Sequence, residues 1–428
     1  MTDFRAEHRA IDWASGEIGA RIRRRNRTQL RLRLVGMAAI GFAFAMLATL
    51  VGSLLWTGTR AFRQTHVAIE VHYDAGILNP DNLQRGNYRA ILGATMQALF
   101  PDLPDSALRK ATAILSNGAQ FMVRDRIVAD PALLGQRISL RVPVSDPYDQ
   151  LHKGLIDRET PEEFRRLKDD EIALWDRLEA AGAVSAPLNW GLITNADSRF
   201  PELAGLRGAL MGSFWALLTC FVLSFPIGIG AAIYLEEFAP KNRTSDFIEV
   251  NINNLAAVPS VVFGLLGLAV FLNWLGLPRS APFVGGMVLA LMTLPTIIIA
   301  TRAALKAVPP SIREAALGLG ASRQQVVFHH VLPLAMPGIL TGTIIGLAQA
   351  LGETAPLLLI GMNAFVTAAP GSPFDPSTAL PTQIFIWADS PERGFVSRTS
   401  AAILVLLMFL VAMNALAIYL RNRFERKW

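Results

Sequence analysis

One carboxylic acid lies inside an apolar segment of this 428-residue chain, where a charge is costly. Glu353 stands in GETAPLLLIG, within a predicted membrane span at 335–361. An ionised group at that depth costs a few kcal/mol, so an intramembrane glutamate indicates a function by default. Pro356, three residues later, loosens the helix beside the carboxylate. The alternative is a glutamate paired with an arginine, or held protonated, for assembly alone.

The stretch SIREAALGLGASRQQVVFHHVLPLAMP, at 311–337, has the pattern of two short helices joined at glycines. Ser311 and Glu314 have the spacing of a capping box, and Ser322 and Gln325 repeat it for the second helix. Gly320 allows the positive φ that a sharp turn requires. Prolines at 333 and 337 are expected to end the second helix.

The first of these helices has a predicted face of small side chains. Ile312, Ala315, Ala316 and Leu319 recur at helical spacing and should form one smooth surface. A rigid hairpin with such a face, placed between two membrane spans, is typical of a docking element. A surface helix that is merely capped is the alternative, and the two interpretations are compatible.

The composition indicates a membrane protein with several spans and a polar insert. Hydrophobic residues make up 52% of the chain and charged residues 17%. Cys220 is the only cysteine, which excludes a disulfide framework and a metal site built from cysteines. The net charge of +6 does not indicate nucleic-acid binding, because the arginines gather at the ends of apolar runs.

The chain divides into four predicted parts. Residues 1–33 are arginine-rich and cytosolic, and 34–56 form a first anchor of about 23 uncharged residues, enough to cross a bilayer. Residues 57–205 mix both charges and predict a small α+β domain. Its predicted strands are 66–74 and 136–144, and its predicted helices are 87–100, 106–126 and 161–181, the last with a Thr160–Glu163 capping box.

Residues 206–428 contain five further predicted spans, which makes six with the anchor. These are 206–235, 251–277, 282–301, 335–361 and 399–420. The basic residues of the short connections gather on the side of the N-terminus, at Lys241, Arg243, Arg302, Lys306, Arg313, Arg323, Arg421, Arg423, Arg426 and Lys427. The positive-inside bias therefore predicts cytosolic termini, a cytosolic loop at 302–334 and an extracytoplasmic domain at 57–205.

The span at 335–361 also has a stripe of small residues. Gly338, Gly342, Gly346 and Ala350 recur every four residues, which lets another helix approach closely. The stripe predicts helix packing.

The hairpin resembles the cytoplasmic coupling loop of ABC-importer permeases, in which Glu-Ala-Ala, a later glycine and a Leu-Pro recur. The matching residues are Glu314, Ala315, Ala316, Gly320, Leu332 and Pro333. His330 departs from the family, which usually has isoleucine there. The resemblance implies that these residues couple the chain to an ATPase.

Three further strings narrow the resemblance to the PstA-type permeases of bacterial phosphate ABC transporters. They are GETAPLLLIG, INNLAAVPSVVFGLLGLAVF and ALPTQIFIWA, and the likeness covers nearly all of 206–428. Many members have arginine where this chain has Gln349, and another near Ile299, whereas Arg302 lies one turn further here. The resemblance implies that Glu353, Gln349 and Arg302 lie along the translocation path.

The resemblance implies a transport subunit of the bacterial inner membrane, which is not itself an enzyme. The sequence has no GxxxxGKS or GxxxxGKT phosphate loop, so ATP and Mg²⁺ would be used by a partner ATPase dimer, and no cofactor is expected on this chain. A second permease subunit and an extracytoplasmic phosphate-binding protein would complete the machine.

Two other functions remain open from the sequence. The hairpin does not distinguish phosphate from another oxyanion, such as sulfate or molybdate. A membrane sensor that binds a ligand through 57–205 is the alternative from a different class. A sensor usually has fewer spans and a cytosolic signalling domain, whereas this chain has five more predicted spans and only short cytosolic segments.

Overall fold

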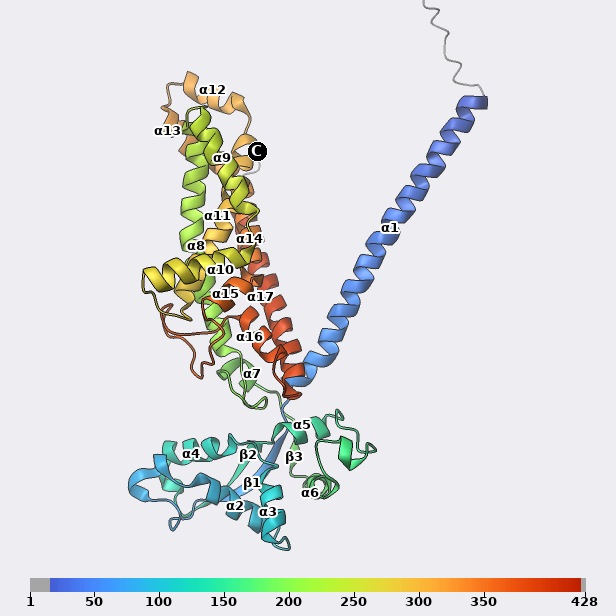
Figure 1. Cartoon of the computed structure of the whole chain (residues 1–428), viewed down its shortest axis with the longest axis vertical. Helices are drawn as coiled ribbons and strands as arrows, with labels where there is room; N and C mark the ends of the chain where they lie inside the picture. Colours follow the sequence, from blue (N-terminus) through green and yellow to red (C-terminus); the bar gives the residue numbers. More distant parts are fainter. Residues whose placement is uncertain (1–15, 425–428) are drawn as a thin grey trace, which may run out of the picture. The chain divides into compact units, whose positions relative to one another are not determined.

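The computed structural model describes residues 16–424, and helices dominate it (Figure 1). Residues 1–56 form one compact unit and residues 57–428 a second. Most of α1 (Gly16–Gly58) belongs to the first unit, and this helix contains the predicted anchor at 34–56. Residues 1–15 of the predicted basic segment, and Arg426 and Lys427, lie outside the described residues.

The second unit begins with a small sheet and the short helices around it. The sheet has the order β2-β1-β3 and is antiparallel throughout. Its elements are η1 (Thr59–Phe62), β1 (His66–His72), η2 (Pro80–Arg85), α2 (Tyr88–Leu99), α3 (Asp105–Thr112), α4 (Ala119–Ala129), η3 (Pro131–Leu133), β2 (Arg137–Pro143), α5 (Asp146–His152), η4 (Glu162–Phe164), α6 (Asp169–Ala180), β3 (Val184–Ser185) and α7 (Gly191–Thr194). We call residues 63–205 the sheet domain.

Alternation along β1 explains the core of the sheet domain. Val67, Ile69 and Val71 are buried and point to one face, while Glu70 and His72 on the other face are exposed. The buried face packs on apolar residues of α2, α4 and α6, among them the fully buried Trp175. Both predicted strands and the helix predicted at 87–100 are confirmed within two residues.

Two helix predictions in this domain are wrong. The helix predicted at 106–126 is broken between α3 and α4, because the Ser116 N–H bonds to the Pro143 carbonyl (2.9 Å) and holds this segment against the end of β2. The helix predicted at 161–181 begins only at Asp169, with Glu171 accepting a bond from the Lys168 N–H at 2.9 Å. Thr160 and Glu163 therefore form no capping box.

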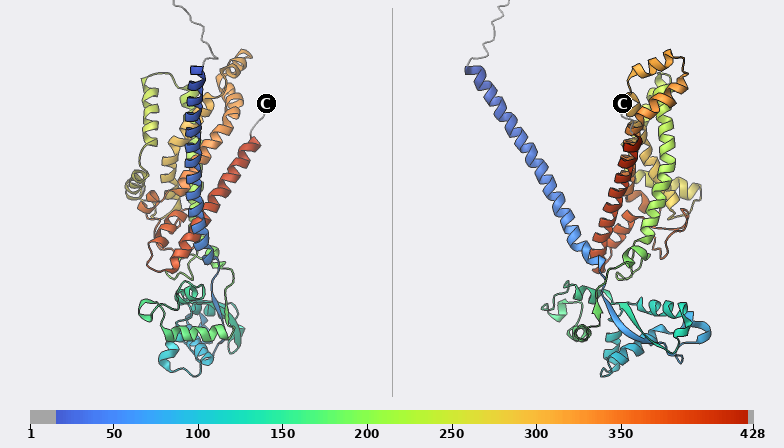
Figure 2. Two further views of the ribbon diagram at one scale, coloured as in Figure 1. Left: turned by 90° about the vertical axis from the view of Figure 1, so that its right-hand side faces the viewer. Right: turned by 180° about the vertical axis from the view of Figure 1, so that it is seen from behind.

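The remainder of the second unit is a bundle of apolar helices, shown from two further sides in Figure 2. Its elements are α8 (Arg207–Ile233), the π-helix η5 (Tyr234–Phe238), α9 (Arg243–Ala256), α10 (Ser260–Leu266), the π-helix η6 (Gly267–Trp274), α11 (Pro282–Lys306), α12 (Pro310–Gly318), α13 (Arg323–Gln325), the π-helix η7 (Val326–Val331), α14 (Leu332–Gly352), α15 (Ala355–Leu359), α16 (Leu380–Ala388) and α17 (Gly394–Phe424). Within residues 16–424, five helices are long and apolar enough to cross a membrane, and one bent pair would make six.

The bent pair corrects the span predicted at 251–277. The chain turns by 103° between α9 and the α10–η6 segment. Pro259, which has extended backbone angles, precedes α10 at this break. A proline restricts the residue before it and lacks the N–H that a continuous helix needs. The apolar run is therefore not one straight span.

Small residues bring α8 and α14 close to α11. A side chain at Gly228 of α8 would lie 2.7 Å from Ile297, and one at Gly342 of α14 would lie 2.1 Å from Ala300. Gly338 meets Ala304 in the same way. The other two members of the stripe, Gly346 and Ala350, also lie buried in the bundle. The stripe thus packs α14 on α11.

Polar contacts join the sheet domain to the nearby end of the bundle. The Trp387 indole of α16 donates to Asp197 at 3.0 Å, and Arg166 bonds to Glu392, two residues before α17. The entry and exit of the domain also meet, because the Asn189 N–H donates to the Phe62 carbonyl at 2.8 Å. The α12–α13 hairpin lies at the opposite end of the bundle (Figure 1).

Candidate functional site

The hairpin at 310–331 is formed by two helices and a glycine with positive φ between them. Gly320 has φ +88°, a conformation that L side chains rarely adopt, so the predicted turn is confirmed. Ser322 accepts from the Gln325 N–H at 3.3 Å, and the Gln325 side chain accepts from the Ser322 N–H at 2.8 Å. This second capping box is also confirmed.

The first capping box, predicted for Ser311 and Glu314, is wrong. Helix α12 begins at Pro310, and Ser311 lies inside it. Proline suits the first helical position, because its missing N–H would have no partner there anyway. The second helix does not end at the prolines either, since η7 continues into α14, which begins at Leu332 and contains Pro333 and Pro337.

The predicted small face of α12 is divided between two directions. Ala316 is buried among Val308, Val326 and Val327, and Ile312 packs on the same cluster. Ala315 is exposed, and Leu319 is 90% exposed. The outer surface of the hairpin therefore consists of exposed residues of both kinds, polar and apolar: Glu314, Ala315, Leu317, Leu319, Gly320 and Phe328.

An ion pair that the sequence did not reveal anchors α12 to the bundle. Arg313 reaches Glu237 of η5 at 2.7 Å and also donates to the carbonyls of Val308 (2.7 Å) and Leu305 (2.9 Å). Both side chains are mostly buried, at 21% and 11% exposed. A bidentate guanidinium in a half-dry setting is a strong and directional link. The acidic pair at the end of an apolar run, Glu236 and Glu237, was the signal available for it.

Arg302 belongs to a second cluster beside the first. Its guanidinium lies 3.3 Å from Glu236 and 2.8 Å from Glu249 of α9, and Lys306 lies 3.6 Å from Glu236. Helix α11 is thereby tied to the end of α8 and to α9. With two carboxylates around it, Arg302 is placed as a link between helices at the hairpin end of the bundle.

Glu353 directly follows the last residue of α14, at the C-cap of the helix. Its backbone is extended (φ −74°, ψ 123°), so the helix stops here and the span predicted to reach residue 361 is shorter. Pro356 is near the start of the short helix α15 that follows. Within residues 16–424 no hydrogen bond or ion pair engages the Glu353 carboxylate, which is half-buried.

Gln349 lies one turn before Glu353 on the same side of α14. It is exposed, as is Gly352, where an added side chain would meet nothing within 4 Å. Arg302 is not brought to this place. Gly338 packs on Ala304 and Gly342 on Ala300, so α14 and α11 run in opposite directions, and Arg302 lies about 20 Å from Glu353 along the helix axis. The structure groups Gln349 with Glu353 but separates Arg302 from them.

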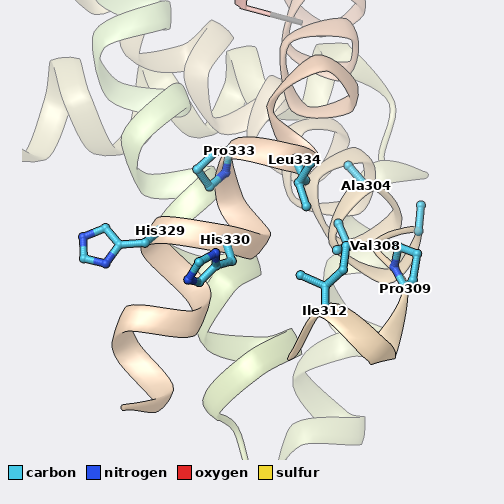
Figure 3. Close-up of a pocket in the computed structure, with 9 residues that line it drawn as sticks. Ala304, Val308, Pro309, Ile312, His329, His330, Pro333 and Leu334 are labelled. Atoms are coloured by element: carbon cyan, nitrogen blue, oxygen red, sulfur yellow. The ribbon is translucent and has the colours of Figure 1, made fainter. Parts of the chain in front are cut away.

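A cavity of ≈ 790 Å³ lies between the hairpin and the ends of α11 and α14. His329 and His330 of η7 line this space together with Val308, Pro309 and Ile312, and the His329 ring points away from these three residues (Figure 3). Pro333 and Leu334 line the same space. The two imidazoles are the polar side chains of this lining, which holds neither an arginine nor a carboxylate.

Comparisons with known families divide the chain into two parts. The family described as binding-protein-dependent transport system inner membrane component matches residues 224–428. A domain family of unknown function, DUF3333, matches residues 19–162. The helical bundle and the N-terminal part are thus similar to separate families.

Relatives of known name match the bundle. The chain is 30% identical over 236 residues to the probable ABC transporter permease protein YqgI of Bacillus subtilis, with 51% of this chain and 79% of the relative covered. It is 32% identical to the phosphate transport system permease protein PstA of Xylella fastidiosa, with 52% and 77% covered. A solved chain of the MetNI methionine ABC transporter aligns with TM-score 0.40 at 16% identity, with 50% and 95% covered.

Proposed function

This chain belongs to the family of binding-protein-dependent transport permeases that includes the PstA proteins, and from this premise we propose that it forms half of the pore of an ATP-driven phosphate importer. Permeases of this family are transport components and not enzymes. The chain is therefore an inner-membrane protein whose chemistry is binding, orientation and movement.

The hairpin supports the proposal most directly. Its outer surface presents Glu314, Ala315 and Leu319 to the solvent, while Arg313 holds the same helix to the bundle through Glu237. A partner that pushes on the exposed side would move η5 and α8 with it. We assign the outer surface to an ATPase dimer, which would use ATP and Mg²⁺. Leu332 and Pro333 are the first residues of α14, so the same motion would also be transmitted to α14.

The orientation follows from the same arrangement. The hairpin and the sheet domain lie at opposite ends of the bundle (Figure 1), so a cytosolic hairpin would put the sheet domain on the outer side of the membrane. The positive-inside bias of the loops supports cytosolic termini. A periplasmic reporter fused near Asp149 should be active, and the same reporter at the C-terminus should be silent. The reverse pattern would overturn the orientation and the assignment of the hairpin.

The open side of α14 suggests where the substrate passes. Gln349 is exposed and Glu353 is half-buried in the described part of this chain, and a second permease subunit would complete the pore opposite them. Two like charges about 4 Å apart repel by about 4 kcal/mol at an effective dielectric of 20. A bare carboxylate would therefore repel phosphate, and Glu353 is better suited to hold an arginine of the neighbouring subunit.

Uptake of labelled oxyanions tests the function. Cells or vesicles that contain the whole transporter, including its extracytoplasmic binding protein, should accumulate labelled phosphate only when this subunit is present. Labelled sulfate and molybdate serve as the controls. Uptake of sulfate or molybdate in place of phosphate would reassign the substrate, and uptake without the subunit would reject its role in the pore.

A further inference from the structure

The sheet domain has an edge that its own chain leaves open. Strand β3 pairs with β1 only at His66 and Val67, and the last bond along this edge joins the Ala68 N–H to the Ala183 carbonyl at 2.9 Å. The residues before Ala183 belong to the turn after α6 and do not lie along β1. Beyond this point β1 continues to His72 with regular pairing to β2 on its other side.

The direction of the backbone N–H and carbonyl groups of β1 shows which of them have no partner strand. Gln64 and Ala68 donate toward the β3 side, whereas the Tyr73 N–H donates to Gln136 beside β2, so even-numbered residues point to the open edge. The Glu70 N–H and carbonyl and the His72 N–H therefore face it. Within residues 16–424 they have no hydrogen-bond partner. These groups have the spacing of a strand that awaits a neighbour.

Helix α2 forms a wall beside this edge. A groove of ≈ 490 Å³ lies between them, lined on the helix side by Ile91, Ala94, Thr95, Ala98 and Leu99. Ala94 and Ala98 are exposed and one turn apart, so small side chains leave room along the strand. A helix flank beside an open strand edge is the setting in which proteins add a peptide as an extra strand.

The charges indicate what kind of strand fits. The Glu70 side chain is exposed and makes no hydrogen bond or ion pair with residues 16–424. The groove also contains the carboxylate of Asp74 and, opposite His72, the guanidinium of Arg137, so acidic groups outnumber the one arginine. Two copies of this edge paired about Glu70 would place two carboxylates together, which is unfavourable. A strand with a basic side chain opposite Glu70 would be complementary.

From these observations we propose that the groove between β1 and α2 binds an extended segment of another polypeptide, which adds to the sheet beside Glu70 and His72 and places a basic residue opposite Glu70. The site lies outside the pore and the hairpin. It does not depend on which anion the bundle moves.

The opposite edge of the sheet supplies a matched control. That edge is formed by β2, whose exposed Arg137 and Arg141 lie on the same sheet face as Glu70, and Arg137 also lines the groove. Ser139 pairs with Glu70 across the two strands, and its N–H faces that outer edge. A proline at Glu70 therefore removes a donor from the groove, and a proline at Ser139 removes one from the other edge, while neither removes a bond between β1 and β2.

The test measures peptide binding to the full-length protein in detergent by fluorescence anisotropy. The probe is a labelled hexapeptide that alternates threonine and valine and has one central lysine. We expect saturable binding that falls at least about tenfold in Glu70→Pro and is unchanged in Ser139→Pro, with both variants melting like the parent protein. Glu70→Lys, which keeps the N–H, should shift the preference to the same peptide with glutamate in place of lysine.

Three outcomes would overturn the proposal. One is the absence of saturable binding up to about 1 mM peptide. Another is equal binding of a probe whose alternate backbone nitrogens are methylated, since that peptide lacks the donors for strand addition. The third is a change in oligomeric state in Glu70→Pro without a change in peptide binding, which would assign the edge to a second copy of this chain.

Discussion

The guanidinium of Arg398 in α17 donates a hydrogen bond of 2.9 Å to the side-chain oxygen of Gln64, two residues before β1 begins. The same guanidinium bonds to the Ala204 carbonyl, and its residue is only 4% exposed. A helix of the bundle thus satisfies polar groups at both ends of the sheet domain.

Arg398→Met should therefore loosen the sheet domain. Two hydrogen bonds from a charged donor are lost and their buried acceptors are left without partners, which should cost about 3 kcal/mol of unfolding free energy. Denaturant unfolding followed by tryptophan fluorescence measures the loss. Arg393→Met, which replaces an exposed arginine five residues earlier, is the matched control and should change little. Equal stability of the two variants would contradict the role of Arg398.

The link between Arg313 and Glu237 should be needed for coupling. Removing either partner leaves the other as a mostly buried charge without its counter-charge, which should lower the unfolding free energy by about 2 kcal/mol. We expect Arg313→Ala and Glu237→Ala to assemble but to move less phosphate for each ATP hydrolysed. A double-mutant cycle on this ratio should show that the two losses are not additive. Additive losses would mean that the pair does not act as one link.

Gly320 should tolerate asparagine better than valine. The cause is conformational, since a side chain there meets nothing within 4 Å and the positive φ of 88° is the only obstacle. Left-handed backbone costs a non-glycine residue about 1–2 kcal/mol, and asparagine bears it best. Uptake should be near the parent level in Gly320→Asn and reduced in Gly320→Val at matched expression. Normal uptake in the valine variant would show that the turn is unimportant.

Glu353→Gln should impair phosphate movement while leaving the complex assembled and its ATPase active. The substitution removes a charge and keeps the shape and hydrogen-bonding capacity of the side chain. Uptake and ATP hydrolysis are measured together in reconstituted vesicles. If uptake for each ATP stays the same, the carboxylate has no transport role and serves assembly alone.

Glu202 should make the stability of the sheet domain depend on pH. Ser116 donates to this buried carboxyl at 2.7 Å, and burial raises its pKa above the ordinary value. The folded state then holds the proton more tightly, so the stabilisation is full at low pH and is lost as the pH rises through the raised pKa.

Glu202→Gln isolates this effect, because the amide does not titrate and can still accept from Ser116. The unfolding free energy of the variant relative to the parent should increase as the pH rises above the ordinary glutamate pKa of about 4.3. Asp197 and His66, whose pKa values are also shifted, are present in both proteins and cancel in the comparison. A difference that shrinks with rising pH would contradict the prediction.

Local signals in the sequence predicted much of the fold. The strands β1 and β2, the long helices α8 and α11, and the turn at Gly320 follow from alternation, apolar length and the special freedom of glycine. Where local signals competed, the stronger one prevailed: a proline at the start of α12 overrode the capping box at Ser311.

Contacts between distant segments could not be predicted in this way. The run at 251–277 is long and apolar enough for one span, and its composition does not specify the 103° turn. The partners of Arg302 and Arg313 stand more than fifty residues away along the chain, so only the folded arrangement of α8, α9 and α11 brings them together. Glu353 was found from its type, but the end of α14 at that residue was not.

The two ends of the sheet domain lie side by side, which is typical of a domain inserted into a loop of another domain. Because Asn189 is bonded to Phe62, and Gln64 to Pro187 at 3.1 Å, the domain begins and ends at one point in space. A domain whose two ends meet can be inserted into a loop, because its size does not change the distance between the two chain positions that it joins. A permease ancestor could acquire or discard the whole block by a single recombination event while the membrane bundle kept its geometry.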